Sequence, residues 1–497
     1  MQTKTVLGID LGTQSLKVLF YDMLGKNVIA TESAALPLYQ NEQGAAEQQA
    51  NWWLDALHQA LAKIDPTIIA STEAIGVSGQ QHGFVPLGKN GAVLAPVKLW
   101  CDTSTLTECE EIMSAYGGAQ QCVVEVGNLI LPGFTASKVR WLAKHANAQY
   151  EQLDCILLPH DYLNFYLTGE RCMEVGDASG TGFLDIRERR WSCRMLHAID
   201  PDRNLAECLP PLHETPGIMG RLRAEVARHT GLREGIPVAT GGGDNMMGAI
   251  GTGNLSPGRA TMSLGTSGTV YAYADSPVID PQGEISAFCS STGGWLPLLC
   301  TMNCTVTTEQ ARRVLGTERA DFEQQVSRSP AGSQGVITLP FYNGERTPNL
   351  PRAKACIIGL DAHNNSPENL LRSALEGATF ALRYGVERMR TLGLDTGNVV
   401  LTGGGAASAT WRQAVADICN VPVTILHQDE GAAFGAALQA LSVLESCHPD
   451  DLQQLANNHL SRNETLCCEP DESTVKLYTE IYQHYQASVN ALTAIYS

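Results

Sequence analysis

The alternation of apolar and polar residues predicts a β-hairpin at the start of the chain. Val6–Asp10 is a short apolar strand that ends in an acidic residue, and Leu16–Asp22 reads as a second strand with alternating faces. The segment between them, Leu11–Ser15, has the glycine and small polar residues of a tight turn. A third strand is expected near Asn27–Ala34.

Beyond the hairpin, helical and strand patterns alternate. Trp53, Leu57 and Leu61 recur at four-residue steps and therefore fall on one face of a helix. The other elements expected in the first half are buried strands at Ile75–Ser78 and Val97–Trp100 and helices at Ser137–Ala146 and Tyr162–Leu167. Strands that alternate with helices predict an α/β fold class.

The same order of elements restarts past the middle of the chain. Strand Pro237–Thr240 leads into the loop Gly241–Asn245 and an apolar helix, and Ala260–Val270 reads as a second hairpin. The triplet Leu264-Gly265-Thr266 repeats Leu11-Gly12-Thr13 in the same strand–turn–strand setting. The later elements expected are helices at 367–392, 411–419, 431–444 and 475–496 and strands at 398–402 and 421–426.

This repetition predicts two related α/β domains. At about 150 residues per domain, 497 residues allow two to four domains. We expect an N-terminal domain at residues 1–238, completed by a C-terminal helix at 475–497, and a C-terminal domain at 239–474. No low-complexity linker separates them, so we expect the domains to share a cleft.

The net charge of −18 argues against nucleic acid as a partner, because phosphate backbones are bound by Lys and Arg. An anion would have to be bound by backbone N–H groups, helix N-termini or a metal. No apolar stretch approaches the roughly 18 residues of a membrane span. The scattered cysteines lack a CxxC pair, which favours free thiols in a reducing compartment and a cytoplasmic location.

Two Gly-Thr turns are candidate phosphate loops, Gly12-Thr13-Gln14-Ser15 and Gly265-Thr266-Ser267-Gly268. Glycine lets a phosphate approach the backbone, and the hydroxyl side chains add donors. Ordinary hairpin turns would use the same residues. The loop Gly403–Ala406 lies between a strand and a helix, where it either receives a flat ring or simply turns the chain. Neither a Walker A motif nor GxSxG or HExxH is present.

Two carboxylates at strand ends could carry chemistry. Asp10 ends an apolar strand beside the first Gly-Thr turn, where a Mg²⁺ ion held through water would satisfy its charge. Asp244 ends a second strand behind three glycines, and it is either a helix N-cap or a general base for a hydroxyl group. Phosphoryl transfer needs a metal together with a residue that orients the nucleophile.

Polar residues also follow two strands of the first half. Gln81 and His82 follow Ile75–Ser78, and Asp102 follows Val97–Trp100. Strand ends are where α/β sheets place ligands, and these side chains suit a polyol. For His82 alone, a structural, hydrogen-bonded histidine is the alternative interpretation.

Taken together, these motifs resemble the FGGY carbohydrate kinases of the actin/hexokinase/Hsp70-like superfamily. The resemblance covers essentially the whole chain in order. The motifs that carry it are Gly8-Ile9-Asp10-Leu11-Gly12-Thr13, Ser78-Gly79-Gln80-Gln81-His82-Gly83, Leu99-Trp100-Cys101-Asp102, Leu131-Pro132-Gly133-Phe134-Thr135, Leu158-Pro159-His160-Asp161, Gly241–Asn245, Leu264–Gly268, Gly344-Glu345-Arg346-Thr347-Pro348, Ala355–Leu360 and Thr402–Ala406.

The resemblance implies two RNase H-like domains that bind ATP, Mg²⁺ and a sugar. It implies Asp244 as catalytic base and Asp10 as the metal- and phosphate-linked carboxylate. Its implied sugar contacts are Gln81, His82, Trp100, Asp102 and Asn245. Its implied ATP contacts are Gly12, Thr13, Gln14, Ser15, Lys17, Gly265, Thr266, Gly404, Gly405 and Ser408. Homodimers are common in the family, although the sequence shows no interface.

The implied activity is ATP-dependent phosphorylation of a ketopentose, D-xylulose, at O5 in xylose catabolism. Gln81, Cys101 and Thr103-Ser104 depart from the family's commoner residues beside the sugar. Another substrate, such as L-ribulose, gluconate or glycerol, is therefore the first alternative. A non-metabolic actin- or Hsp70-like ATPase and a non-enzymatic sugar sensor are further alternatives.

Overall fold

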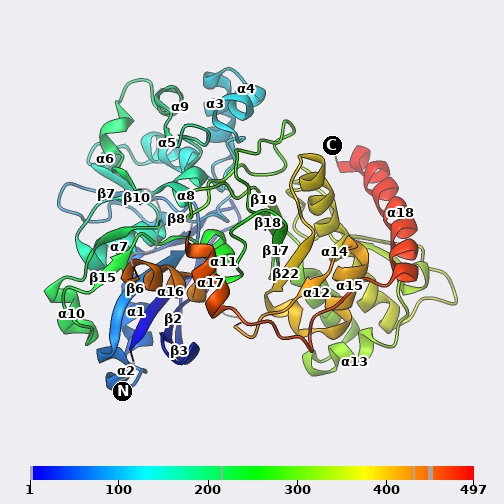
Figure 1. The fold of residues 1–497 in the computed structure, drawn as a ribbon. Helices are drawn as coiled ribbons and strands as arrows, with labels where there is room; N and C mark the ends of the chain where they lie inside the picture. The colour runs from blue at the N-terminus through cyan, green and yellow to red at the C-terminus, as the bar shows by residue number, and fades with distance from the viewer. Residues whose placement is uncertain (1–3, 214–215, 429–430, 446–450, 497) are drawn as a thin grey trace. The chain divides into compact units, whose positions relative to one another are not determined.

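The computed structural model describes residues 4–213, 216–428, 431–445 and 451–496. The chain divides into two compact units (Figure 1). Unit 1 comprises Met1–Leu255, Ala274–Leu296 and Glu430–Leu460, and unit 2 comprises Ser256–Tyr273, Pro297–Asp429 and Ser461–Ser497. The predicted α/β class is confirmed, because strands and helices alternate in both units.

Unit 1 is built on a seven-stranded sheet of order β14-β15-β6-β1-β2-β3, with β16 also paired to β6. Its strands are β1 (Thr5–Leu11), β2 (Ser15–Asp22), β3 (Asn27–Ala35), β6 (Thr72–Gly79), β14 (Ile218–Arg221), β15 (Pro237–Ala239) and β16 (Gly242–Gly243). The predicted opening hairpin is confirmed by the antiparallel pairing of β1 with β2. Both β1 and β16 run parallel to β6, so their carboxyl ends lie at one edge of the sheet.

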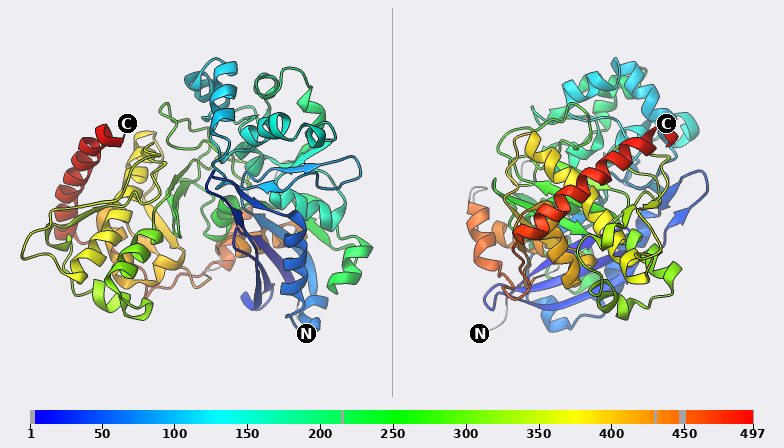
Figure 2. Two further views of the ribbon diagram at one scale, coloured as in Figure 1. Left: turned by 180° about the vertical axis from the view of Figure 1, so that it is seen from behind. Right: turned by 90° about the vertical axis from the view of Figure 1, so that its right-hand side faces the viewer.

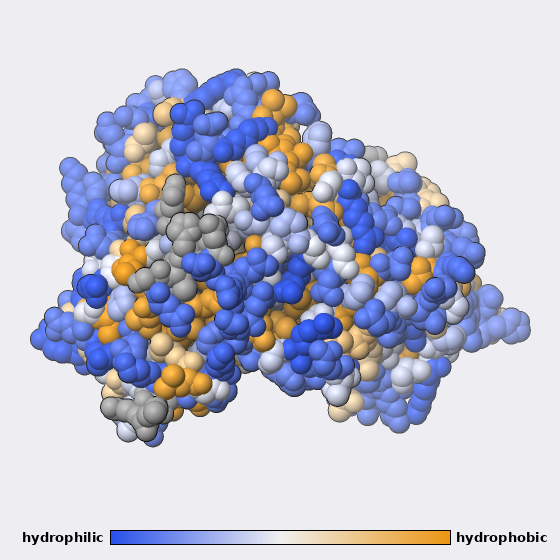
Figure 3. All heavy atoms as spheres, in the orientation of Figure 1, coloured by the Kyte–Doolittle hydropathy of each residue, from blue (hydrophilic) through white to orange (hydrophobic). Residues whose placement is uncertain are grey.

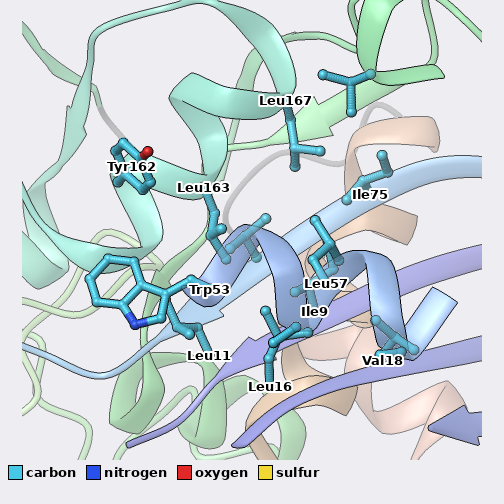
Figure 4. Close-up of a cluster of buried hydrophobic side chains, with 14 of the residues drawn as sticks. Ile9, Leu11, Leu16, Val18, Trp53, Leu57, Ile75, Tyr162, Leu163 and Leu167 are labelled. Atoms are coloured by element: carbon cyan, nitrogen blue, oxygen red, sulfur yellow. The ribbon is translucent and has the colours of Figure 1, made fainter. Parts of the chain in front are cut away.

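One face of this sheet packs on α1 (Ala50–Leu61) and α7 (Pro159–Thr168). Successive strand residues point to opposite faces, and Ile9, Ile75 and Val18 all point into this core. Figure 4 shows them around Leu57 of α1, with Trp53 of α1 and Leu163 of α7 in the same cluster. The apolar face predicted for α1 is thereby confirmed as buried.

The opposite face packs on α16 (Gly431–Leu444), backbone against backbone. A Cβ atom added at Gly8 of β1 would lie 2.0 Å from the Ala433 carbonyl oxygen, and one added at Gly76 of β6 would lie 2.0 Å from that of Ala436. Real Cβ atoms do not approach oxygen this closely, so only glycine fits at either position. The Ala- and Gly-rich sequence of α16 is what permits the approach.

Unit 2 repeats the strand arrangement of unit 1 in a five-stranded sheet of order β19-β18-β17-β22-β23. In each unit a central strand pairs antiparallel with the next strand of its hairpin and parallel with a later strand. The strands of unit 2 are β17 (Arg259–Leu264), β18 (Gly268–Ala272), β19 (Leu298–Thr301), β22 (Asn398–Thr402) and β23 (Val423–Thr424). The repeat predicted from the two Leu-Gly-Thr triplets is thus present in the topology.

The units divide the chain differently from the predicted domains. Residues 239–255 and α16 pack on the sheet of unit 1 rather than belonging to the second half. The C-terminal helix α18 (Glu472–Tyr496) belongs to unit 2, where it packs across α14 (Pro367–Thr391), as Figure 2 shows. Its Tyr478 donates a hydrogen bond to Glu376 Oε1 (2.7 Å) and packs edge-on against Phe380. These long-range contacts left no signal in the local sequence pattern.

The remaining elements that concern the site lie in the segments between these strands. They are β8 (Val97–Lys98), shorter than predicted, α5 (Thr135–His145), α8 (Val175–Ala178), α11 (Asp244–Gly251), α12 (Thr305–Leu315), α13 (Phe322–Val326) and α15 (Ala409–Cys419). The other elements are β4 (Tyr39–Gln40), β5 (Ala46–Gln48), α2 (Pro66–Ala70), β7 (Val85–Leu87), α3 (Leu106–Tyr116), α4 (Ala119–Val126), α6 (Asn147–Tyr150), β9 (Cys155–Leu157), β10 (Met173–Glu174), α9 (Cys193–Ile199), α10 (Ala224–Thr230), β20 (Ile337–Leu339), β21 (Cys356–Ile358) and α17 (Leu452–His459).

Hydrophilic residues predominate on the face drawn in Figure 3, with apolar residues interspersed among them. Among the described residues, no helix combines the length and apolar character needed to cross a membrane. Every cysteine in the described part of the chain carries a free thiol.

The close approach of α16 predicts that Gly76→Ala destabilises unit 1. The added methyl group would meet the Ala436 carbonyl, and overpacking of this kind costs about 1–3 kcal/mol. Gly431→Ala is the matched control, because a Cβ atom at this first residue of α16 meets nothing within 4 Å. Urea denaturation should show a lower midpoint for Gly76→Ala alone; equal midpoints for the two variants would contradict the packing described here.

Candidate active site

The strand register brings Asp10 and Asp244 to the same edge of the sheet in unit 1. Asp10 of β1 pairs in register with Ser78 of β6, and Ser78 pairs with Gly242 of β16. The three strands are parallel, and Asp244 follows β16 directly as the first residue of α11. Two strand ends far apart in sequence thus contribute one carboxylate each.

Asp10 is surrounded by polar partners on its own face of the sheet. Ser78 donates a hydrogen bond to Asp10 Oδ1 (2.8 Å). Lys17 of β2 stands opposite Asp10 in the antiparallel ladder, and directly opposed residues point to the same face. The predicted nucleotide contact Lys17 therefore lies beside the predicted metal-linked carboxylate.

Asp244 is held by its neighbour Asn245 through one oxygen only. The Asn245 backbone N–H (2.8 Å) and side-chain Nδ2 (3.0 Å) both donate to Oδ1. Within the part of the chain that the structure describes, Oδ2 accepts no hydrogen bond. The N-cap of α11 is Gly243, so the alternative prediction that Asp244 caps this helix is wrong.

The environment of Asp244 favours its protonated form more than water does. Burial, together with the charges of Asp10 and Asp177, raises the pKa of Asp244 to about 7. A carboxyl group with this pKa, partly exposed and with one unengaged oxygen, is suited to accept a proton near neutral pH.

Gln81 is joined to Asp244 by the same asparagine. Asn245 Nδ2 donates to Gln81 Oε1 (2.9 Å) as well as to Asp244. Gln81 is 5% exposed, and its side-chain amide also interacts with the carboxylate of Asp177. The structure thus brings Gln81, Asn245 and Asp244 together, as predicted.

His82 adopts a left-handed backbone conformation (φ 64°) that is uncommon for residues other than glycine. Its ring packs against both Phe134 and Phe288, with centroid separations of 4.9 and 5.5 Å, and these two phenylalanine rings also contact each other at 6.0 Å. Its carbonyl oxygen accepts hydrogen bonds from Thr135 Oγ1 (3.1 Å) and Lys138 Nζ (2.8 Å). Lys138 was not among the predicted site residues, because the local sequence does not distinguish it from an exposed lysine on a helix surface.

Thr13 of the first Gly-Thr turn is part of a partly buried chain of hydrogen bonds. Its hydroxyl accepts from Trp100 Nε1 (2.9 Å) and donates to Gln80 Oε1 (3.0 Å). Gln80 in turn donates to Gln48 Oε1 (3.0 Å). The single hydroxyl proton of Thr13 is therefore engaged, unlike the free phosphate donor that the sequence suggested. The amide N–H groups of Thr13 and Gln14 donate to no acceptor in the described residues.

Asp102 lies inside the protein instead of lining an open pocket. Its side chain is fully buried. One oxygen accepts from the Ala46 amide (2.9 Å) and Lys98 Nζ (3.2 Å), and the other accepts from the Ser104 amide (2.9 Å) and hydroxyl (2.6 Å). A carboxylate with four protein donors has little capacity left for a sugar, so its direct sugar contact is not supported by this geometry.

The predicted nucleotide residues of unit 2 occupy two turns. The carbonyls of Gly265 and Thr266 accept hydrogen bonds from Thr305 (2.9 Å) and Cys304 (3.0 Å) at the start of α12, while Thr266 itself is exposed. A Cβ atom at Gly404 would meet nothing within 4 Å, so this backbone is open to a flat ligand.

Gly405 and Ser408 serve the packing of the same turn. A Cβ atom at Gly405 would lie 2.7 Å from the Leu264 side chain. The Ser408 hydroxyl caps α15 by accepting from the Trp411 amide (3.0 Å), and it donates to Glu323 of α13. Its hydroxyl proton is already engaged, which leaves no donor for a nucleotide.

A buried charged cluster of His160, Asp161 and Asp177 packs against the Gly241–Asp244 segment. It was not predicted from the sequence. His160 Nδ1 lies 2.7 Å from Asp177 Oδ2, and its Nε2 lies 3.0 Å from Asp161 Oδ1. Although burial opposes it, the two carboxylates raise the pKa of His160 well above its usual value. Asp177 is one of the charges that raise the pKa of Asp244. The only local signal was the adjacent His160-Asp161 pair.

The residues at this edge of the sheet fit a Mg²⁺ ion that is coordinated by few protein side chains. The carboxylate oxygens of Asp10 are hard ligands of the type that Mg²⁺ prefers. The described residues include no group of three or more His, Cys, Asp or Glu side chains arranged to hold a metal. An ion here would therefore take most of its ligands from water and phosphate, which is usual for Mg²⁺.

Comparison with known proteins agrees with the predicted resemblance. Models of the N- and C-terminal domains of the FGGY family of carbohydrate kinases match residues 5–251 and 260–443. The chain is 42% identical over 493 residues to a xylulose kinase from Haemophilus influenzae, covering 98% of this chain and 99% of that protein. It is 34% identical over 436 residues to a xylulose kinase from Escherichia coli, covering 87% and 88%.

Solved structures include one of similar fold along nearly the whole chain. The structure of a xyloylose kinase from Brucella ovis has a TM-score of 0.90 and 30% sequence identity, and the match covers 99% of this chain and 100% of that one.

The buried contacts of Asp102 predict a stability defect in Asp102→Asn. The amide would place an N–H group against donors that now bind a carboxylate, and breaking a buried charged network costs about 3–5 kcal/mol. Asp55→Asn, at an exposed position of α1, is the control. Thermal unfolding measures the difference. An unchanged melting temperature with an altered sugar KM would instead restore the prediction of a direct sugar contact.

Proposed function

Because the chain belongs to the FGGY family of carbohydrate kinases, we propose that it transfers the γ-phosphoryl group of ATP to O5 of D-xylulose. The observation that carries the proposal is the Asp244 carboxyl group. This group has a pKa near 7 and an unengaged Oδ2, and it follows directly after strand β16. Relatives that match the chain over nearly its whole length include a xylulose kinase.

In this reaction Asp244 Oδ2 takes the proton from the 5-hydroxyl group. The freed oxygen forms a bond to the γ-phosphorus while the bond from that phosphorus to the β,γ-bridging oxygen breaks, and ADP leaves with the electron pair. Asn245 keeps Oδ1 engaged through two hydrogen bonds, so only Oδ2 is oriented for proton transfer.

Neutral donors bind the nucleotide in this proposal. In unit 1, the Thr13 and Gln14 amides would donate to phosphate oxygens. In unit 2, the Gly265-Thr266 turn and Gly404 are the proposed nucleotide contacts. When bound, Mg²⁺ would neutralise charge on the phosphates; Asp10 would hold it through water. Backbone amides suit a protein with a net charge of −18, which lacks a basic surface for the purpose.

The sugar would be bound by polar groups at the end of β6. The Gln81 amide, held at the end of β6 through Asn245, would bind a ketose hydroxyl or carbonyl oxygen. The His82 ring packs against two phenylalanines, Phe134 and Phe288. Trp100 has committed its indole N–H to Thr13, so any contact it makes with the sugar is through its ring. A homodimer and a cytoplasmic location stay predictions.

The proposed base predicts the behaviour of Asp244→Asn. Removing a general base lowers kcat by about 10²–10⁴-fold, while ATP binding should stay within twofold of wild type. A coupled ADP-release assay over D-xylulose, L-ribulose, gluconate and glycerol measures both substrate choice and turnover. Asp55→Asn serves as control. Wild-type turnover by Asp244→Asn would remove Asp244 from the mechanism, and turnover of another substrate in preference would reassign the sugar.

The raised pKa of Asp244 predicts the pH dependence of the reaction. Only ionised Asp244 accepts a proton, so kcat/KM for the sugar should fall about tenfold per pH unit once the pH drops below about 7. Initial rates from pH 5 to pH 9 give the profile. An acidic limb near pH 4, the ordinary value for aspartate, would show that burial and neighbouring charges do not act on this group.

A further inference from the structure

Lys138 of α5 is an entirely buried lysine that the reaction does not use. Its side chain has no exposed surface. Its Nζ donates to two backbone carbonyls, those of His82 (2.8 Å) and Gly133 (2.7 Å). In the described part of the chain, no carboxylate lies within 4.0 Å of it. A buried lysine without an ion-pair partner is costly, which raises the question of what it contributes.

The energetic cost of this burial is visible in the titration of the side chain. Burial lowers the pKa of Lys138 to about 7, even though the charge of Asp102 acts in the opposite direction. Either protonation state retains at least two N–H donors, so both carbonyl contacts persist on each side of this pKa. A methionine of similar length would avoid the cost but would leave both carbonyls without this donor.

One end of α5 holds His82 from two directions. Phe134, the N-cap of α5, packs against the His82 ring, while Thr135 and Lys138 donate to the His82 carbonyl. A Cβ atom at Gly180 would lie 2.2 Å from the same ring, so the ring cannot move to that side. The left-handed backbone at His82, costly in isolation, is thus fixed by contacts to both its carbonyl and its ring.

The second carbonyl connects Lys138 to the segment that carries Trp100. A Cβ atom at Gly133 would lie 2.8 Å from the Trp100 carbonyl oxygen, so these two backbones are in close contact. Lys138 therefore bridges the turn with Gln81 and His82 to the segment beside Trp100.

We propose that Lys138 is a positioning residue for sugar recognition. It fixes the left-handed turn at His82 and the adjoining Gly133 backbone, and thereby sets where Gln81 and His82 present their side chains to a ketose. This inference rests on the proposed sugar site. It requires no contact between Lys138 and the substrate.

Lys138→Met tests the proposal, because it keeps the length of the side chain and removes both hydrogen bonds. The expected result is a sugar KM raised at least tenfold, with the KM for ATP within twofold of wild type. Equilibrium binding of the sugar without nucleotide should weaken by the same factor. Lys144→Met, at the other end of α5 and more exposed, is the matched control and should leave both sugar values within twofold.

A second variant decides the matter if Lys138→Met does not fold. Thr135→Val keeps the shape of the side chain and removes only the second donor to the His82 carbonyl, so it should raise the sugar KM about two- to fivefold and leave the KM for ATP unchanged. Equal rises in both KM values, or no change in sugar affinity, would overturn the positioning role.

The sugar used is the one that wild-type protein phosphorylates best. If that sugar is not D-xylulose, the proposed substrate fails, while the comparison of Lys138→Met with wild type still tests the role of Lys138.

Discussion

The direct contact of α16 with β1 and β6 is the constraint on which the rest of unit 1 depends. Gly8 and Gly76 leave no space for a side chain between sheet and helix. The same helix meets α11 just as closely, since a Cβ atom at Gly435 would lie 1.8 Å from the Met247 carbonyl oxygen. Because α11 begins at Asp244, the helix that covers the sheet also fixes the proposed base relative to the strand that carries Asp10.

The charged groups around Asp244 determine its proton affinity. Asp244 stands near Asp10 and Asp177, so its proton affinity rises into the neutral range. In the proposed reaction, phosphate recognition is left to amide groups that add no charge, such as those of Thr13 and Gln14. The hydroxyl of Thr13 is occupied in linking the turn to Trp100 and Gln80. A strongly acidic protein can bind a polyanion in this way, because the donors are local and neutral.

The sequence predicted the features that are encoded locally. Strand–turn–strand patterns predicted the two hairpins. Acidic residues after apolar runs indicated Asp10 and Asp244 as candidate site residues at strand ends. Features that depend on distant partners were missed. Asp102 has the same appearance in sequence as an accessible strand-end carboxylate, and only the fold places Lys98 and the Ala46 amide against it. Likewise, Lys138 is marked out solely by the distant His82 carbonyl that it binds.

The central claim is transfer of a phosphoryl group from ATP to O5 of D-xylulose. Correlated ¹H–³¹P NMR of the product tests it most directly, because the two methylene groups of the sugar differ. The C5 protons couple to H4, whereas the C1 protons have no vicinal neighbour on the carbonyl carbon C2. The account predicts a phosphorus signal correlated with the methylene group that couples to H4. A phosphorus signal on the uncoupled C1 methylene, or inorganic phosphate as the sole product, would contradict it.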